Sequence, residues 1–300
     1  MTYFTVIDLA NAFFSVPLHP QSQPLFAFTF KGQQYTYSRL PQGYRDSPGL
    51  FNKILKTHLL ELTFPQGVVL IQYVDDLLLA AITALLCLTA TEDLLKLLHR
   101  KGYKIKKEKI QLARRQVVFL GRTISAAGLG VSTSHRQSIL HHPLPTTVSD
   151  MLSFLGLTGY SRSHIPDYAN RAAPLRALLA EAGNRNLTAP LLWTAEAEAS
   201  FTDLKQALAQ AAALMAPDYS SPFHLDVSEQ NAMLNAVLYQ KKGGDRQVLM
   251  YHSSKLDIVE SGQTSCAGTW QRWQRRWRKR PTLSCVTPYR YTPVMECQHF

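Results

Sequence analysis

Short apolar runs separated by turn residues dominate the first third of the chain, and they predict strands. The runs at residues 4–9 and 13–18 are dense in β-branched and aromatic side chains, which favour strands. Three pairs of runs predict β-hairpins, at residues 25–30 with 33–38, 68–73 with 77–81, and 117–120 with 122–125. Apolar residues at helical spacing predict two helices, over 47–62 and 92–101.

Helical patterns take over after residue 123. One helix is predicted to begin at Thr147-Val148-Ser149-Asp150, since these residues favour a helix start, and to end by Pro166. A helix over 195–212 then precedes predicted strands at 223–227, 236–240 and 248–252. From about residue 263 the strand pattern stops, and residues 270–280 are rich in Trp and Arg. The four predicted regions are residues 1–123, 124–185, 186–262 and 263–300.

Composition indicates a globular protein of two or three domains with an anionic partner. The 300 residues are 46% hydrophobic and 18% charged, which argues against disorder along most of the chain. The net charge of +11 favours nucleic acid ahead of a membrane surface. The apolar run at residues 77–90 is too short to span a bilayer, and the N-terminus has no signal-peptide pattern. The four cysteines form no CxxC pair, so we expect an intracellular, reduced protein, with cytoplasm or nucleus undecided.

The candidate chemistry lies in acidic residues at the ends of apolar strands. Asp75 and Asp76 connect two such runs, and like charges this close raise a pKa unless a cation neutralises them. Mg²⁺ is the natural cation because it prefers carboxylate oxygens together with phosphates. Asp8 ends another apolar run and supplies the third carboxylate of a two-metal site for in-line phosphoryl transfer. The dipeptide alone fits a solvated turn, so the assignment depends on the neighbouring motifs.

Those motifs, taken in order over about residues 2–260, resemble the reverse transcriptases of gammaretroviruses and related endogenous retroviruses. The resemblance implies an α/β (α+β) architecture. It comprises a polymerase palm with an antiparallel sheet and partial fingers (1–123), a helical thumb (124–185), an RNase H-like α/β connection domain (186–262) and a degenerate basic tail (263–300). The motifs are Asp8-Leu9-Ala10-Asn11-Ala12-Phe13-Phe14, Leu40-Pro41-Gln42-Gly43-Tyr44, Tyr73-Val74-Asp75-Asp76, Lys109-Ile110-Gln111, Phe119-Leu120-Gly121 and Phe154-Leu155-Gly156.

The resemblance implies an RNA-directed DNA polymerase that extends a DNA primer on an RNA or DNA template. Asp8, Asp75 and Asp76 would hold two Mg²⁺ ions, with Mn²⁺ as the alternative. The partners would be a template-primer duplex and dNTPs, without a membrane, and the oligomeric state stays undetermined. Lys109 would either protonate the leaving pyrophosphate or belong to a basic run that holds phosphates, and the sequence does not decide between these roles.

Further positions acquire roles through the same resemblance. Phe13 would select deoxynucleotides by packing where a ribose 2′-hydroxyl would lie. Gln42 would contact the template or the incoming nucleotide, and Tyr73 would lie under the primer end. Phe119, Leu120 and Gly121 would form the primer grip.

Departures from the family pattern keep two other functions open. In the family, basic finger residues precede the segment that matches Asp8, so we expect this chain to lack that grip on the triphosphate. Asn11 and Glu108 replace a family acid and a family lysine. A non-catalytic nucleic-acid-binding remnant is therefore one alternative. An RNase H-type hydrolase is another, although Asp226 lacks a visible acidic set around it and is expected to be structural. For the tail we favour a solvated segment over a nucleic-acid-binding one.

Overall fold

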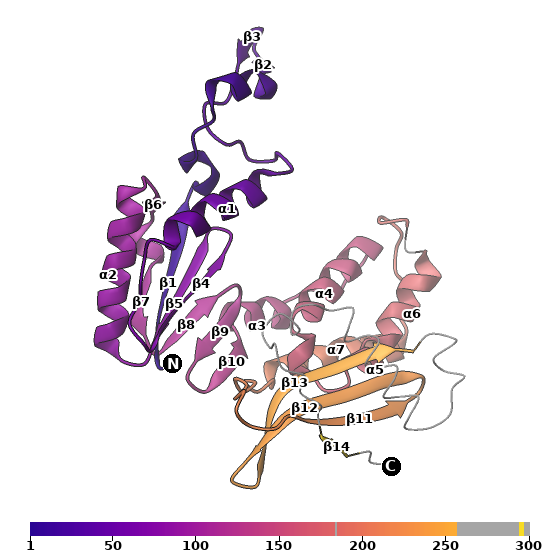
Figure 1. Ribbon diagram of the computed structural model, residues 1–300. Coiled ribbons are helices and arrows are strands. Elements are labelled where there is room, and N and C mark those ends of the chain that lie inside the picture. Colours follow the sequence, from indigo (N-terminus) through magenta and orange to yellow (C-terminus); the bar gives the residue numbers. More distant parts are fainter. Residues whose placement is uncertain (184, 257–293, 297–300) are drawn as a thin grey trace. The chain divides into compact units, whose positions relative to one another are not determined.

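The computed structural model describes residues 1–183, 185–256 and 294–296. The chain divides into two compact units, Met1–Ala126 and Ala127–Phe300 (Figure 1). Both units combine helices with antiparallel strands, which confirms the predicted mixed α/β class. Within the residues that the structure describes, no helix combines the length and apolarity needed to cross a bilayer.

The centre of unit 1 is a five-stranded sheet. Its strand order is β4-β5-β1-β6, and β7 also pairs with β1. The strands are β1 (Tyr3–Ala10), β4 (Val68–Tyr73), β5 (Asp76–Ala81), β6 (Lys104–Ile105) and β7 (Gln111–Arg114). All of these pairings are antiparallel.

Two helices cover one face of this sheet, α1 (Ser47–Leu59) and α2 (Ala84–Arg100). Side chains alternate between the faces of a strand, so Ile7 and Leu9 of β1 pack against these helices. Phe4 and Val6 point to the other face, where they meet the β8–β9 hairpin. That hairpin consists of β8 (Gln116–Phe119) and β9 (Arg122–Ser125). Central strand β1 is thus buried on both faces as far as Ile7, whereas Asp8 and Ala10 are only half-buried. The outer strand β4 keeps one face open, since Val69 and Ile71 are exposed.

Helix α2 is longer than predicted, and the reason is local. The apolar run at 77–90 is divided between two elements, since strand β5 ends at Ala81. The Thr83 hydroxyl then accepts a hydrogen bond from the Leu86 backbone N–H at 3.2 Å. This cap starts the helix eight residues before the predicted residue 92.

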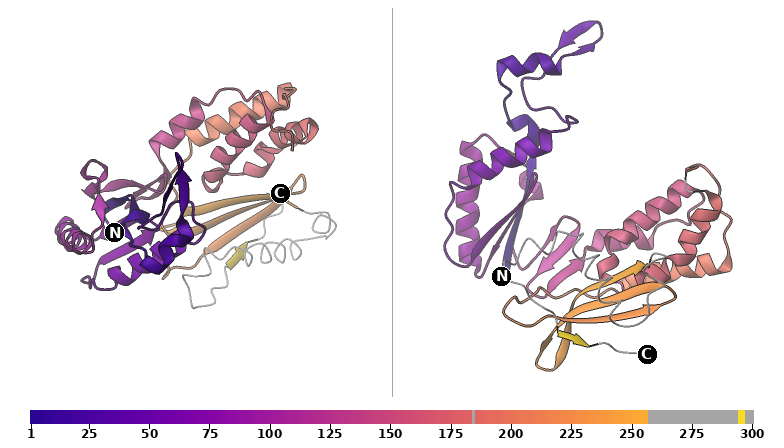
Figure 2. Two further views of the ribbon diagram at one scale, coloured as in Figure 1. Left: turned by 90° about the horizontal axis from the view of Figure 1, so that it is seen from above. Right: turned by 45° about the vertical axis from the view of Figure 1, so that its right-hand side comes forward.

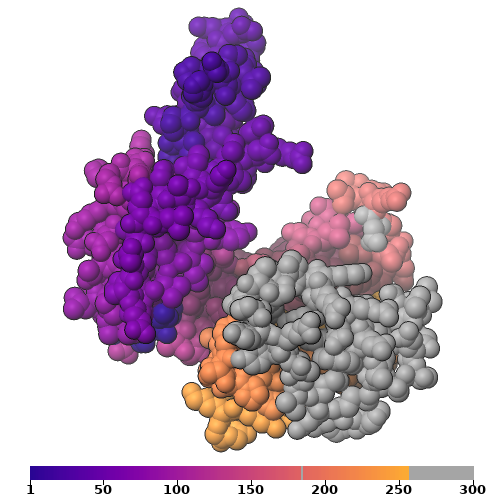
Figure 3. Space-filling model, viewed as in Figure 1, coloured from indigo at the N-terminus to yellow at the C-terminus, as the bar shows by residue number. Residues whose placement is uncertain are grey.

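The strand predicted at 13–18 is wrong. Asn11 adopts a left-handed conformation (φ 51°), and the chain turns into the 3₁₀ helix η1 (Ala12–Ser15). A second 3₁₀ helix, η2 (Pro20–Phe26), leads to the hairpin of β2 (Phe28–Phe30) and β3 (Gln33–Tyr35), whose turn lies at Lys31 and Gly32 as predicted. The residues of this hairpin are exposed, and it projects from the rest of unit 1 (Figures 1 and 3). A third 3₁₀ helix, η3, spans Lys107–Lys109.

Unit 2 begins with β10 and a group of helices. Their core includes Met151, Phe154, Leu175, Phe201 and Leu204. The Thr147 hydroxyl and the Asp150 carboxylate form a capping box at the start of α4, which confirms the predicted helix start. The elements are β10 (Gly128–Val131), α3 (Thr133–Leu140), α4 (Val148–Tyr160), η4 (Arg162–His164), α5 (Tyr168–Arg171), α6 (Ala173–Ala182) and α7 (Ala195–Ala209).

The rest of unit 2 is a four-stranded sheet with order β13-β12-β11-β14 (Figure 2). Its strands are β11 (His224–Gln230), β12 (Met233–Lys242), β13 (Asp245–Lys255) and β14 (Val294–Glu296). The first three form an antiparallel meander, and β14 pairs in parallel with β11. The Trp- and Arg-rich cluster at 270–280, with its predicted solvated character, lies outside the described residues.

Candidate active site

Strand register brings the predicted acids together at one end of the unit 1 sheet. Asp8 on β1 is the direct partner of Asp76 on β5. Directly opposed residues of antiparallel strands point to the same face, so both carboxylates share the face away from α1 and α2. Asp75 immediately precedes Asp76, and its carbonyl oxygen accepts the Leu9 backbone N–H at 3.1 Å. The sequence predicted these three residues as one site, and the fold places Asp8 and Asp76 on adjacent strands with Asp75 in the turn before β5.

The connection between β4 and β5 is a tight two-residue turn at Val74-Asp75. Val74 has a φ of 51°, a left-handed conformation that a β-branched residue rarely adopts. Such a residue costs about 1–3 kcal/mol and persists only where its surroundings enforce it. The Gln72 side chain supports the turn, because its Nε2 donates to Asn52 Oδ1 of α1 at 2.7 Å and to the Val74 carbonyl at 3.4 Å.

A lysine partly neutralises the carboxylates. The Lys109 Nζ atom in η3 lies 2.6 Å from Asp8 Oδ2, with the two side chains 57% and 30% exposed. The hydrogen bond to Asp8, followed by its charge, raises the pKa of Lys109. Burial, followed by the charges of Asp75 and Asp8, raises the pKa of Asp76. The site therefore carries an excess of negative charge.

These residues fit a divalent metal in chemistry but not in their present arrangement. Among the described residues, no group of three His, Cys, Asp or Glu side chains is placed to hold a metal ion. Three carboxylates in mutual repulsion offer hard oxygen ligands, the type that Mg²⁺ prefers. The Lys109 ammonium already takes a cation's position against Asp8. A metal ion at this site would therefore compete with Lys109 for Asp8.

The other predicted site residues lie on separate elements of unit 1. The Phe13 ring packs edge-on against Phe51 of α1, with ring centroids 5.5 Å apart. Gln42 is exposed in the loop before α1, and Tyr73 at the end of β4 is 58% exposed. The structure assembles none of these three side chains with the acids through a hydrogen bond or ion pair.

The segment predicted as a primer grip forms the turn of the β8–β9 hairpin. Phe119 is buried against Phe4 and Val6, so it anchors the turn. Leu120 (φ 49°) and Gly121 (φ 70°) make the turn itself, and Leu120 is 38% exposed. This hairpin packs on the same sheet face that carries Asp8 and Asp76.

Sequence reasoning missed Arg39, which lies before α1 and lines a small pocket with Lys104 and Asn11. No sequence motif around Arg39 indicates a binding role. Lys104 comes to lie near Arg39 only because β6 pairs with β1.

Asp226 in unit 2 has protein partners for both of its carboxylate oxygens. Its Oδ2 atom forms an ion pair with Arg246 Nη1 at 2.8 Å, and its Oδ1 accepts the Tyr239 hydroxyl at 3.2 Å. The Arg246 guanidinium also lies over the Tyr239 ring, 4.8 Å from its centroid. This arrangement agrees with the structural role predicted for Asp226.

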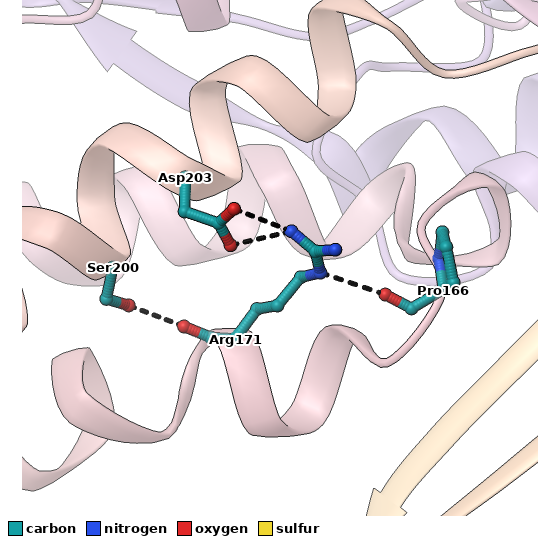
Figure 4. A network of polar contacts seen from close by, with 4 residues as sticks. All are labelled: Pro166, Arg171, Ser200 and Asp203. Carbon is teal, nitrogen blue, oxygen red and sulfur yellow. Dashed lines mark hydrogen bonds and ion pairs between the residues drawn. The ribbon is translucent and has the colours of Figure 1, made fainter.

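A cavity of about 690 Å³ in unit 2 lies beside a second ion pair. Arg171 Nη1 donates to both Asp203 carboxylate oxygens at 2.7 Å, and its Nε donates to the Pro166 carbonyl at 3.2 Å (Figure 4). The Ser200 hydroxyl donates to the Arg171 carbonyl, so α5 is tied to α7 twice. Both arginines that line the cavity, Arg171 and Arg246, are engaged by carboxylates, which favours a structural role for these two side chains.

Comparison with known proteins shows what the two units are similar to. The family model described as reverse transcriptase (RNA-dependent DNA polymerase) matches residues 1–124. The model described as an RNase H-like domain found in reverse transcriptase matches residues 193–268.

Among known sequences, the Gag-Pol polyprotein of Gibbon ape leukemia virus is 40% identical over 273 residues, which is 88% of this chain and 16% of that protein. The Pol polyprotein of Feline endogenous virus ECE1 is 40% identical over 272 residues, 88% of this chain and 25% of that protein. The chain thus spans about a sixth to a quarter of the length of these relatives. A foamy viral protease-reverse transcriptase solved in complex with an RNA/DNA hybrid superposes with a TM-score of 0.83 at 27% identity, covering 99% of this chain and 38% of that one.

Proposed function

Because residues 1–124 belong to the reverse transcriptase family and 88% of the chain resembles retroviral Pol polyproteins, we propose that this chain performs template-directed nucleotidyl transfer onto a DNA primer. The observation that carries the proposal is the pairing of Asp8 with Asp76 next to the Asp75 turn. Strand register places three acids at one open end of a sheet, which stability alone would disfavour.

Reverse transcriptases use divalent metal ions, and we assign Mg²⁺ binding to Asp8, Asp75 and Asp76. When bound, the ions would polarise the reacting phosphate and stabilise the leaving pyrophosphate. The three carboxylates supply the oxygen ligands, and the strained turn at Val74 fixes the direction of Asp75. Mn²⁺ is the alternative ion, because it also accepts carboxylate oxygens.

The proposed substrates are dNTPs and a template-primer duplex. A structure similar to this chain is described as a complex with an RNA/DNA hybrid, and another as a complex with dsDNA. In this assignment the β8–β9 turn holds the primer, Tyr73 lies under its end, Gln42 contacts the template or nucleotide, and Phe13 selects deoxynucleotides. Lys109, released from Asp8, would donate a proton to the leaving group.

Primer extension tests the proposal. Purified chain receives an RNA template, a DNA primer, dNTPs and Mg²⁺, with Asp75→Asn as the matched control because it removes one charge at constant shape. Extension that disappears in Asp75→Asn supports the proposal. Equal extension in both proteins would refute the metal assignment, since the activity would then not depend on the Asp75 carboxylate.

A nucleic-acid-binding protein without catalysis is the second candidate. Two observations support it. Lys109 forms an ion pair with Asp8, and among the described residues no three side chains are placed to hold a metal ion. Duplex binding that weakens with salt, without extension, would favour it. An RNase H-type hydrolase has no comparable support, because Asp226 is engaged by Arg246.

A further inference from the structure

The large cavity of unit 2 lies between one helix and the outer strand of the sheet. A stripe of residues at helical spacing along the end of α7 lines it, namely Asp203, Gln206, Ala207 and Gln210. Three residues of β13 line it as well, Arg246, Val248 and Tyr251. The partners of these three on β12 are alternate residues, so the three share one face of the sheet. A helix stripe and a sheet face therefore border a volume of about 690 Å³.

The free polar groups of this cavity are uncharged. Four of its side chains form no hydrogen bond or ion pair with a described residue, Gln206, Gln210, Gln247 and Tyr251. By contrast, Arg171 is held by Asp203 (Figure 4), and Arg246 is held by a carboxylate of β11. A glutamine amide both donates and accepts hydrogen bonds, as a peptide unit does. These groups therefore suit a ligand made of amide units better than a free ion.

Strand β13 presents backbone groups to the same space. It is the outer strand of its sheet, and the Val248 carbonyl accepts a hydrogen bond from the Met215 backbone N–H at 2.9 Å. A segment outside the sheet thus already pairs with this edge. The backbone groups of Arg246 and Tyr251 also point away from β12, because their partners alternate along that strand. On that outer edge, neither residue has a backbone partner in the part of the chain that the structure describes.

The length of the lined stretch favours a chain segment over a small molecule. Arg246 and Tyr251 lie five residues apart, and a rise of about 3.3 Å per residue puts them roughly 16 Å apart. An extended peptide of about five residues covers this distance. The other wall is rich in alanine, at Ala207, Ala211, Ala212 and Ala213. These short side chains leave room for a peptide backbone to approach closely.

Positive charge lies at one end of the stretch. Arg246 Nη1 is 2.8 Å from its carboxylate partner, yet the Arg246 side chain remains 51% exposed. A guanidinium has donors on three nitrogens, so a second carboxylate can bind to it from the solvent side. Lys241 and Lys242, which are exposed at the end of β12, add charge of the same sign. An acidic residue of a bound peptide is therefore favoured at this end.

We propose that the cavity binds an extended peptide segment of a partner protein, about five residues long, with small uncharged side chains and an acidic residue at the Arg246 end. The amides of Gln206, Gln210 and Gln247 contact the main chain of the peptide, and the outer edge of β13 adds backbone hydrogen bonds. This binding does not involve the acidic site of unit 1, so it is independent of polymerase activity.

Fluorescence anisotropy with a labelled peptide tests the site. The probe is Glu-Ala-Thr-Ala-Glu with blocked ends, which presents an acid in either chain direction. Gln210→Met keeps the length of the side chain but removes its amide, and Ala213→Leu fills part of the cavity. We expect each to weaken binding about five- to tenfold, as for the loss of one hydrogen bond or of the space for one contact. Gln230→Met and Ala216→Leu make the same changes at exposed positions outside the cavity and should bind as the wild type does.

Two altered probes test the chemistry without changing the protein. N-methylation of the central amides removes main-chain donors and leaves the side chains as they are, so it should weaken binding about tenfold. The peptide Lys-Ala-Thr-Ala-Lys reverses the charge and should bind more weakly than the original probe.

The proposal would be overturned by any of three results with folded protein, which a melting scan of each variant establishes. These are no saturable binding to the wild type, unchanged binding in both Gln210→Met and Ala213→Leu, and equal binding of the N-methylated probe. Two other occupants would overturn it as well. A dimer in sedimentation that is lost in Ala213→Leu would assign the cavity to a second copy of the chain. Displacement of the peptide by a single-stranded oligonucleotide whose binding needs Gln210 would assign it to nucleic acid.

Discussion

Replacement of Lys109 by methionine tests whether this lysine competes with metal ions for the acidic site. The Nζ atom lies 2.6 Å from Asp8 Oδ2, and Lys109 also interacts electrostatically with Asp76 and Asp75. Methionine keeps the length and flexibility of the side chain but carries no charge. In the wild type a divalent ion competes with the ammonium for Asp8, and in the variant it has no such competitor. We therefore expect Lys109→Met to bind Mn²⁺ more tightly.

The exposure of the pair sets the size of this effect. The two side chains are 57% and 30% exposed, so water screens their attraction, and a single exposed ion pair changes affinity by about two- to fivefold. Lys109 acts on three carboxylates rather than one, which raises the expected gain to about five- to tenfold in Kd. The gain in affinity should shrink in 0.5 M salt, because the screening length is about 10 Å at 0.1 M salt and becomes shorter as salt is added.

Electron paramagnetic resonance of free Mn²⁺ measures the affinity without relying on catalysis. The control is Lys106→Met, since Lys106 belongs to the same basic run but it is Lys109 that pairs with Asp8. Equal affinity in Lys109→Met and Lys106→Met would refute the competition. Unchanged affinity with slower primer extension in Lys109→Met would leave only the role of proton donor, and a change in both would assign Lys109 both roles.

Four further predictions concern the stability of the two units. Gly128→Ala should destabilise the chain by roughly 2–5 kcal/mol in urea unfolding, because a Cβ there would lie 1.9 Å from a backbone oxygen at φ 129°. Gly156→Ala, with open space around it in α4, should stabilise by about 0.5–1 kcal/mol. A double-mutant cycle of Arg171→Ala and Asp203→Ala should give a coupling of about 0.5–1 kcal/mol, since the pair is partly exposed, and a coupling of zero would contradict the geometry in Figure 4. Burial, followed by the charge of Lys101, lowers the pKa of His58 below its ordinary value of 6.5. Below pH 6.5 the unfolded chain therefore binds more protons than the folded chain, and stability is lost as the pH falls. His58→Gln should reduce the difference between urea midpoints at pH 7.5 and 5.5.

The sequence predicted the acidic residues of the site because their signal is local. Asp75-Asp76 lies between two apolar runs, and a tight connection between two such strands has few alternatives. The register that sets Asp8 against Asp76 was not predicted, since residues 68 positions apart carry no periodic signal. The family resemblance implied only that Asp8 joins Asp75 and Asp76 at one site. The capping box at Thr147 and Asp150 was likewise predictable, because both partners lie within one helical turn.

The failed and missed features depend on contacts that sequence patterns do not contain. Residues 13–18 have strand composition, yet the left-handed Asn11 turns the chain into η1. The pocket of Arg39 and Lys104 exists only because β6 pairs with the last residues of β1, and β6 itself is two residues long. Such a short edge strand has too little sequence to be predicted.

The acidic end of the sheet opposes stability in two ways, through its carboxylates and through its turn. Like charges directly across two strands repel, and burial with Asp75 and Asp8 raises the pKa of Asp76. Val74 adds a left-handed β-branched residue to the same turn. Lys109 offsets only part of this cost, because it pairs with a single carboxylate oxygen and is itself half exposed. A sequence selected only to fold would replace any of these residues with benefit, so their concentration at one strand end supports the proposed role in binding a cation.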